Sequence, residues 1–385
     1  MLCFAAMVPL LAVHEWFVPA SVKAQLSTAD HLADPGFWPS QTGNPADSFV
    51  GAEACAKCHA EIVQSQRRTP MAITVMPVAA SEVLKEHPRL TFQNGAFHHT
   101  IETTGSGSTY SVTDGAETIS APLIWAFGMG RVGQSYLYTR DGTWYESRAT
   151  YFATLNNLGF TPGRTLLNPH DVGEAMARPV PPQDVMKCFS CHATGVPATQ
   201  KVDTTRLTLG ISCEGCHGPG AKHVAAMQAA ELTEGVASGG GNSEILNPRK
   251  LAPADAVDFC GACHTTWWDV KLTGAKGVAT LRSQPYRLEN SRCWGKGDPR
   301  ITCTACHDPH QALNTNIAEY DGKCLACHSA GLSAKPTADH PGAGCPVATK
   351  DCVSCHMPKI EDPDNHYKFT DHDIRVVRAN EALPQ

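Results

Sequence analysis

The sequence has no apolar run long enough to cross a membrane. The apolar stretch near its start, residues 2–13, is much shorter than the roughly 20 residues that a spanning helix needs, and His14 and Glu15 follow it directly. Val22-Lys23-Ala24 is a small-residue cleavage pattern, although a basic start is missing. We therefore predict that residues 1–24 are a signal peptide, with a membrane anchor as the alternative.

The chain also lacks an excess of positive charge. It has 31 Lys and Arg against 37 Asp and Glu, a formal net charge of −6. Nucleic acids and anionic membrane surfaces bind basic proteins, so neither is an expected partner. A protein partner with a basic patch would suit this chain better.

The sequence is instead rich in cysteine followed by histidine at a fixed spacing. In Cys-x-x-Cys-His two thiols bond the vinyl groups of haem c, and the adjacent imidazole becomes the proximal iron ligand. Zinc sites and disulfides are the rival interpretations. A zinc site, however, does not require that a histidine directly follow the second cysteine of each motif. The seven copies, numbered 1 to 7 in chain order, are Cys55-Cys58-His59, Cys188-Cys191-His192, Cys213-Cys216-His217, Cys260-Cys263-His264, Cys303-Cys306-His307, Cys324-Cys327-His328 and Cys352-Cys355-His356.

The motif count predicts both the cofactor and the fold. Seven covalently bound haem c groups, attached in the periplasm or at the cell surface, leave about fifty residues to cover each haem, so porphyrins should form much of the core. With 27 Pro and 32 Gly, the chain is predicted to be a mainly α multihaem cytochrome c with little regular secondary structure. We expect one small antiparallel β-hairpin insertion between haem 1 and haem 2.

Turn dipeptides locate this insertion. Asn94-Gly95, Asp114-Gly115 and Asp141-Gly142 separate strand-like runs, as in successive hairpins. The predicted organisation is a haem 1 segment at residues 25–89, a β-hairpin subdomain at residues 90–160, and a haem-rich domain at residues 161–385 that holds haems 2 to 7.

The sixth ligand of each iron decides whether a haem only transfers electrons or also binds substrate. His223 and His310 lie too close to the proximal histidine of their own motif to reach the far face of that ring, so each is predicted to ligate a neighbouring haem. Met71 follows motif 1 and would raise the potential of haem 1, or it packs on the haem face instead. The predicted set of seven distal ligands is Met71, His170, His223, His310, His340, His366 and His372.

Two further groups of residues have open roles. Five arginines are candidate partners of the haem propionates, with ordinary surface charge as the alternative: Arg67, Arg68, Arg131, Arg292 and Arg300. Cys293 and Cys345 are the cysteines outside the motifs once residues 1–24 are removed. An oxidising compartment permits them to form a disulfide, and two buried thiols are the alternative.

Four strings resemble a known family: Gly51-Ala-Glu-Ala-Cys-Ala-Lys-Cys-His59, Cys213-Glu-Gly-Cys-His-Gly-Pro-Gly220 with His223, Cys303-Thr-Ala-Cys-His-Asp-Pro-His310, and Cys352-Val-Ser-Cys-His-Met-Pro358 before Thr370-Asp-His372. They resemble the multihaem cytochromes c of the cytochrome c-554 and c-prime group, and more distantly hydroxylamine oxidoreductase and pentahaem nitrite reductase. The resemblance covers the haem-binding segments, about two thirds of the chain, and implies that His223 and His310 are distal ligands.

The sequence departs from the pentahaem nitrite reductases in two ways. Their catalytic haem usually lies on a Cys-x-x-Cys-Lys motif, and no such motif occurs in this sequence. The segment after His356 is also too short for the long C-terminal helices through which those enzymes dimerise. Both differences argue against nitrite reduction, and they leave the oligomeric state open.

The sequence therefore predicts an extracytoplasmic heptahaem c-type cytochrome that relays electrons between redox proteins. We expect an electron carrier more than a catalyst, and no catalytic residue is predicted. The alternative is a multihaem oxidoreductase with one five-coordinate haem that acts on a small nitrogen or sulfur oxyanion. A third interpretation is a structural subunit of a larger assembly, with the hairpin region as its docking surface.

Overall fold

The structure is a computed structural model, and it describes residues 48–163, 165, 168–196, 202–232, 244–294, 300–328, 345, 347–378, 381 and 383–384. The predicted signal peptide and His340 lie outside the described residues. No helix in the described ranges is both long and apolar enough to cross a membrane.

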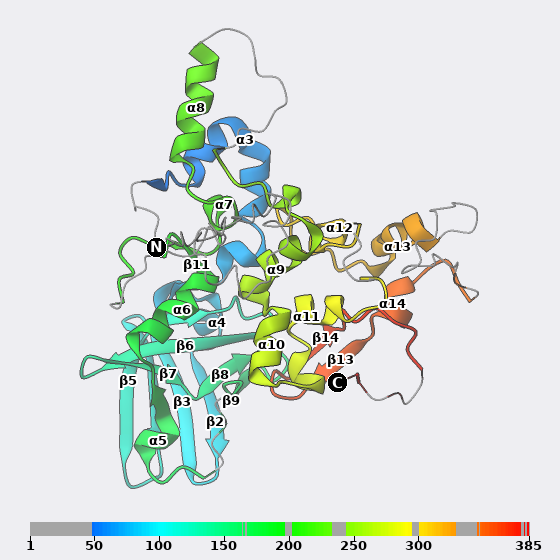
Figure 1. Ribbon diagram of the computed structural model, residues 1–385. Coiled ribbons are helices and arrows are strands. Elements are labelled where there is room, and N and C mark those ends of the chain that lie inside the picture. The colour runs from blue at the N-terminus through cyan, green and yellow to red at the C-terminus, as the bar shows by residue number, and fades with distance from the viewer. Residues whose placement is uncertain are drawn as a thin grey trace, which may run out of the picture.

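A ten-stranded antiparallel sheet fills one half of the molecule (Figure 1). Its main path runs β10-β7-β6-β5-β4-β3-β2, while β1 pairs with β5, and β8 pairs with both β6 and β9. The strands are β1 (Val75–Pro77), β2 (Arg89–Asn94), β3 (Phe97–Thr104), β4 (Gly107–Thr113), β5 (Thr118–Phe127), β6 (Gly133–Arg140), β7 (Thr143–Ser147), β8 (Ala149–Phe152), β9 (Asn157–Phe160) and β10 (Ala177–Pro179).

Tight turns join several consecutive strands of this sheet. Asn94 ends β2 and Gly95 follows it in the turn to β3, Asp114-Gly115 lies between β4 and β5, and Asp141-Gly142 lies between β6 and β7. Asp141 and Gly142 have φ values of 50° and 75°, the left-handed conformation that a two-residue hairpin turn requires. The sheet also extends beyond residues 90–160, because β1 precedes this range and β10 follows it.

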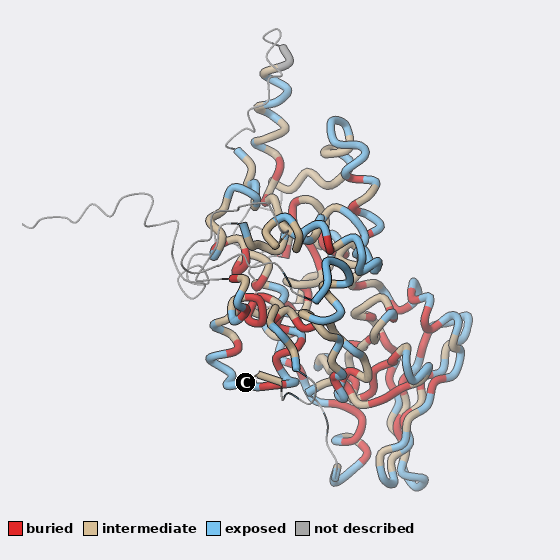
Figure 2. The backbone as a smooth tube through the Cα atoms, turned by 90° about the vertical axis from the view of Figure 1, so that its right-hand side faces the viewer, coloured by how far each residue is buried: buried red, intermediate tan, exposed pale blue. Residues whose placement is uncertain are grey.

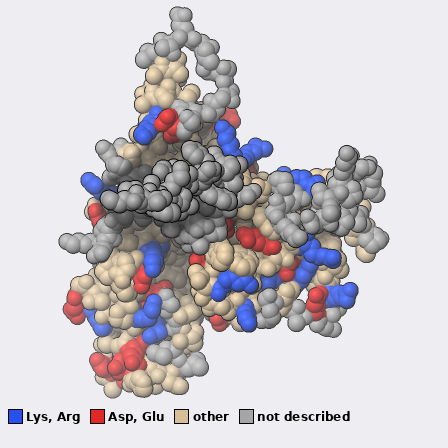
Figure 3. Space-filling view, viewed as in Figure 1, with Lys and Arg blue, Asp and Glu red and all other residues tan. Residues whose placement is uncertain are grey.

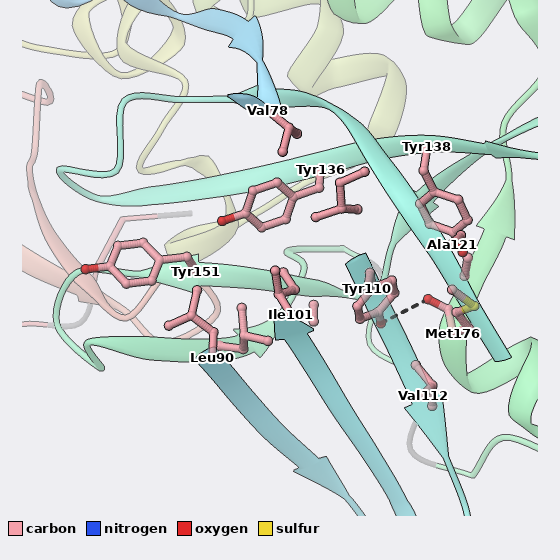
Figure 4. Packing of buried hydrophobic residues seen from close by; sticks show 14 of the residues in the cluster. Val78, Leu90, Ile101, Tyr110, Val112, Ala121, Tyr136, Tyr138, Tyr151 and Met176 are labelled. Carbon is pink, nitrogen blue, oxygen red and sulfur yellow. Dashed lines mark hydrogen bonds between the residues drawn. The ribbon is translucent and has the colours of Figure 1, made fainter. Parts of the chain in front are cut away.

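The sheet has a hydrophobic core of its own (Figure 4). Tyr110, Tyr136 and Tyr138 are fully buried in it, together with Ile101. The Tyr110 hydroxyl donates a hydrogen bond to the carbonyl of Met176 at 3.1 Å, which satisfies its polar group inside the core. This half of the molecule is thus packed by side chains and needs no porphyrin.

The prediction of a mainly α fold with one small hairpin insertion was wrong. The chain combines a large antiparallel sheet with a helical half. The prediction assumed that every part of the chain is used to cover haems, whereas residues from β2 to β9 bury one another instead. These residues are not available to cover a cofactor, so fewer than fifty residues would remain for each predicted haem.

The other half consists of short helices, and each motif lies on one or ends one (Figure 1). Helices α6 and α9 begin with Pro182 and Pro253, a favourable first position, and end on the motif histidines His192 and His264. The α-helices are α3 (Ala52–Gln66), α4 (Glu82–Glu86), α5 (Val172–Met176), α6 (Pro182–His192), α7 (Cys213–His217), α8 (Ala221–Leu232), α9 (Pro253–His264), α10 (Trp267–Thr273), α11 (Gln284–Glu289), α12 (Cys303–Cys306), α13 (Asp321–His328) and α14 (Cys352–His356).

Small elements complete this half. They are the 3-10 turns η2 (Pro70–Ile73), η3 (Val78–Ala80), η4 (Pro248–Lys250), η5 (Gly277–Thr280) and η6 (Ile317–Tyr320), and the two-stranded pairs β11 (Ala193–Thr194) with β12 (Thr208–Leu209) and β13 (Lys359–Asp362) with β14 (Tyr367–Thr370). Buried residues are concentrated in the sheet, while much of the helical half is of intermediate or high exposure (Figure 2). Its small core cluster contains Val257, Leu288 and Trp294.

The sheet supports the helical half at motif 2. Phe189 of α6 packs against Trp125 and Phe127 of β5, with ring centroids 5.4 and 5.3 Å away. The Phe127 ring also contacts the His192 ring edge to face at 5.3 Å. This apolar contact fixes the end of α6, and with it the direction of the His192 imidazole.

Candidate haem-binding site

One large cavity runs through the described part of the helical half. Its volume is about 4530 Å³, and residues of all seven motifs line it. A pocket for one small organic ligand is typically about 300–1,000 Å³. Divided among seven motifs, the cavity offers about 650 Å³ for each, so its size fits several large cofactors and exceeds the needs of one.

The lining of the cavity is more positive than the rest of the chain. It includes seven acidic residues and eleven basic ones: Lys57, Lys222, Arg249, Lys250, Arg282, Arg292, Lys323, Lys350, Lys359, Lys368 and Arg375. The whole chain, by contrast, carries a formal charge of −6. Each haem brings two propionates, which such cations would neutralise. Of the five arginines predicted for this role, Arg292 lines the cavity.

Exposed apolar side chains also line the cavity. Leu313, Val347 and Val376 have exposed fractions of 61%, 89% and 62%, and Ile62 follows with 47%. Apolar surface of this kind normally marks a binding site. Porphyrin rings in the cavity would cover these side chains, so the donor set, the charge and the apolar surface all fit haem c.

The motif thiols come together in pairs from different motifs. Interacting pairs are Cys55 with Cys213, Cys191 with Cys263, Cys260 with Cys303, and Cys324 with Cys352. Electrostatic interactions also link Cys216 to Cys260, and Cys306 to Cys324. The motifs are therefore arranged in the order 1-3-4-5-6-7, with motif 2 beside motif 4.

Backbone carbonyls orient several motif histidines. Nδ1 of His192, His217 and His356 lies 3.1, 2.8 and 2.8 Å from the carbonyl oxygens of Thr74, Leu246 and Arg375, respectively. A metal-binding histidine usually donates its second N–H in this way, which fixes the tautomer and leaves Nε2 for the metal. These three imidazoles are thus oriented as proximal ligands would be.

His217 and His310 face one another across the cavity. Their ring centroids are 6.0 Å apart, and the ring planes differ by 5°. An iron between two imidazoles lies about 2 Å from each nitrogen, which places the ring centres roughly 6 Å apart. Asp308 Oδ1 lies 3.3 Å from His310 Nδ1, so this ring too has its second nitrogen paired.

His307 and His372 form a second facing pair. Their centroids are 6.3 Å apart, with 41° between the ring planes. His372 Nδ1 lies 3.0 Å from the carbonyl oxygen of Thr370. Burial lowers the pKa of His372 to about 4, so its imidazole is neutral at physiological pH, as an iron ligand must be. His307 and His372 could thus hold one iron between them, in keeping with the prediction that His372 is a distal ligand.

The other predicted distal ligands differ in position. Met71 and His223 line the cavity, and the buried Nδ1 of His223 has no hydrogen-bond partner. His170 is exposed and lies away from the cavity lining. His366 packs on Phe152 of β8 at a centroid distance of 4.8 Å and is also absent from the lining. The structure therefore brings four of the seven candidates to the cavity, and His340 lies outside the described residues.

The sequence did not point to Arg282. This residue lines the cavity, and its charge interacts with both His192 and His264, the histidines of motifs 2 and 4. Burial lowers its pKa, while Asp362 opposes this shift. Its position next to two motifs makes Arg282 a stronger candidate to pair with a haem propionate than the arginines predicted from the sequence.

Cys293 and Cys345 form no disulfide in the described part of the chain.

Glu214, inside motif 3, holds motif 1 in place. Its Oε1 accepts hydrogen bonds from the backbone N–H groups of Val50 and Gly220, at 2.9 and 2.8 Å, and its Oε2 accepts one from Gly51 at 2.8 Å. Gly51 is the N-cap of α3, whose own side chain offers no cap. A carboxylate that is only 2% exposed thus caps the helix of another motif.

Replacing Glu214 with alanine is expected to lower the free energy of unfolding by about 3 kcal/mol, because three N–H groups at a buried site lose their acceptor. Chemical denaturation of the holoprotein measures this loss. Glu102→Ala is the matched control, since Glu102 pairs with Arg89 on the exposed surface, where ion pairs contribute at most about 1 kcal/mol. Equal effects of the two substitutions would contradict the capping role.

Asp321 makes the same kind of connection between motifs 6 and 7. It begins α13, which carries motif 6, and accepts hydrogen bonds from the N–H groups of Asp351 and Cys352 at 2.7 and 2.8 Å. These groups lie at the start of α14, which carries motif 7. Both carboxylates therefore join motifs whose thiols also interact, 1 with 3 and 6 with 7.

The Asp321 contact is expected to weaken in acid. The N–H groups of Cys352 and Asp351 hold the pKa of Asp321 below its usual value. A depressed pKa contributes stability that is present above the unfolded-state pKa, about 3.9, and is lost as the pH falls through the folded-state pKa. Asp321→Asn should therefore destabilise the protein more at pH 6 than at pH 3. Unfolding at both values tests this, and an equal loss at each would contradict it.

Comparison with known proteins gives one family match. The model of the family described as cytochrome c554 and c-prime matches residues 170–218, a segment that contains motifs 2 and 3. No curated protein matches. Among solved structures, the crystal structure of the outer cell wall cytochrome OcwA is similar, with 15% sequence identity and a TM-score of 0.47, covering 86% of this chain and 80% of that one.

The family match and the attachment motifs together support a c-type cytochrome, a protein that binds haem c covalently. The match covers part of the chain, residues 170–218.

Proposed function

We propose that the protein is an extracytoplasmic heptahaem c-type cytochrome that relays electrons between redox partners. The observation that carries this proposal is the single cavity lined by all seven motifs. Electron transfer needs cofactors close to one another, and the motif order 1-3-4-5-6-7 connects every motif to a neighbour. We further propose a haem 1 segment at residues 25–89 and a haem-rich domain at residues 161–385, with the sheet between them.

The haems would supply the electron-accepting chemistry, and the chain supplies attachment, orientation and exclusion of water. The fourteen motif cysteines would form the thioether bonds, and the seven motif histidines would be the proximal ligands. We assign His310 to the far side of haem 3 and His372 to that of haem 5, on the strength of the facing ring pairs. His223 and Met71 are the remaining cavity-lining candidates.

The surface charge supports a protein partner in place of nucleic acid. The chain is negative, and the haem propionates would add further negative charge. On the face seen in Figure 3, acidic and basic side chains are mixed over both the sheet and the helical half. A periplasmic or cell-surface location follows from the attachment of haem c outside the cytoplasm. The proposed relation to hydroxylamine oxidoreductase and pentahaem nitrite reductase rests on the motif strings alone.

An anaerobic reductive titration tests the relay directly. The purified holoprotein should accept seven electrons, and after a small initial pulse of reductant all haems should reach equilibrium rapidly. A subset of haems that stays oxidised, or that equilibrates with the rest only slowly, would overturn the proposal of one connected relay.

A second candidate function is a multihaem oxidoreductase with one five-coordinate haem. The observation in its favour is that His170 and His366, two predicted distal ligands, lie away from the cavity lining. A high-spin iron in the spectrum of the oxidised protein would support this function. A wholly low-spin spectrum would exclude it.

A further inference from the structure

A buried arginine lies outside the cavity lining. Arg287 of α11 is 1% exposed. Its Nε and Nη2 donate to the two carboxylate oxygens of Asp371, both at 2.8 Å, in a bidentate pair. Its Nη1 donates to the carbonyl of Pro384 at 3.1 Å. One guanidinium thus holds two parts of the C-terminal segment against α11.

Asp371 organises the short turn that follows it. Its Oδ1 accepts from the N–H of Asp373 at 3.0 Å, and its Oδ2 accepts from Arg375 Nη1 at 2.6 Å. Two guanidinium groups, those of Arg287 and Arg375, therefore pair with this one carboxylate, which is itself fully buried.

This turn contacts two motif histidines. His372, the residue between Asp371 and Asp373, faces His307 of motif 5. The carbonyl of Arg375 accepts the hydrogen bond from Nδ1 of His356, the histidine of motif 7. His372 and the carbonyl that orients His356 thus lie on one turn, and Arg287 holds this turn through Asp371.

We propose that Arg287 is a positioning residue that holds His372 on the iron of haem 5 and orients His356 beneath the iron of haem 7. This inference rests on the proposed function, because it takes His372 as a distal ligand. Arg287 holds Asp371 in place, and the hydrogen bonds of Asp371 hold the turn that follows it. This turn sets the direction of the His372 imidazole. Without Arg287 the buried carboxylate of Asp371 loses its bidentate partner and keeps only Arg375 and the N–H of Asp373, so the turn would rearrange locally.

The test is the spin state of the oxidised holoprotein. Arg287→Met should convert one haem in seven from low-spin to high-spin, as the reference variant His372→Ala does, and added imidazole should restore the low-spin signal in both. Arg89→Met is the matched control, since Arg89 lies on β2 in an exposed pair with Glu102, and it should leave the spectrum unchanged. If Arg287→Met does not fold, Arg287→Lys keeps the charge, loses the bidentate geometry and should give a smaller high-spin fraction.

The outcomes separate the two claims. If His372→Ala leaves the spectrum wholly low-spin, His372 is not a ligand, and that part of the proposed function fails. If His372→Ala gives a high-spin haem while both Arg287 variants match the wild type, the ligand assignment stands and the positioning role of Arg287 is overturned.

Discussion

Removal of haem 5 is expected to separate the remaining haems into two groups. Electron exchange between these groups should be slower by orders of magnitude than in the intact protein. The triple variant Cys303→Ala, Cys306→Ala, His307→Ala removes both thioether bonds and the proximal ligand. Motif 5 lies between the groups 1-3-4-2 and 6-7, since Cys303 contacts Cys260 of motif 4 and Cys306 interacts with Cys324 of motif 6. Electron tunnelling falls off exponentially with distance, so the gap left by one lost haem should dominate the rate.

Pulse reduction followed by rapid optical spectroscopy measures this exchange. The matched control is the same triple replacement at motif 2, Cys188→Ala, Cys191→Ala, His192→Ala, because motif 2 lies beside motif 4 and outside the main line. Both variants carry six haems, yet only the first should show two kinetically separate populations. Rapid equilibration in the motif 5 variant would contradict the proposed order of haems.

Replacement of His310 with alanine is expected to open the iron of haem 3. The imidazole faces His217 at a ring distance of 6.0 Å, and the proposed ligation depends on it. Its loss should produce one additional high-spin haem, and after reduction one additional carbon monoxide should bind per protein, because an open iron accepts external ligands. Difference spectra and gas titration measure both quantities.

His170→Ala is the control for this prediction. His170 was also proposed as a distal ligand, but it is exposed and lies away from the cavity lining. The substitution should change neither the spin state nor the carbon monoxide stoichiometry. A result in which His170→Ala opens an iron and His310→Ala does not would reverse the assignment made from the structure.

The residues that attach haem could be found by sequence because their chemistry is local. Two thiols and an imidazole within five residues define the motif, and short turns such as Asp141-Gly142 are likewise encoded by their own φ preferences. These features need no knowledge of distant parts of the chain.

The arrangement in space could not be predicted, because it depends on contacts between distant residues. His307 and His372 are far apart in sequence, and no spacing rule pairs them. Glu214 occupies one of the two unspecified positions of motif 3, and nothing in the sequence indicates that it caps the helix of motif 1. Arg287 is one of many arginines until its burial against Asp371 is seen.

The size of the sheet was missed for a related reason. The turn signals between residues 90 and 160 indicated hairpins, but β1 and β10 are only three residues each and join the sheet from outside that range. Strands so short have no periodicity to recognise, and only pairing with β5 and β7 defines them. The haem count then led to an underestimate of how much of the chain packs on itself.

All seven motifs should carry haem in one shared cavity, and the intact mass of the protein purified from its own compartment measures this. A polypeptide mass increased by seven covalently attached haems is expected. A fully processed protein with fewer than seven, in which one or more motifs remain as free thiols or as disulfides, would contradict it.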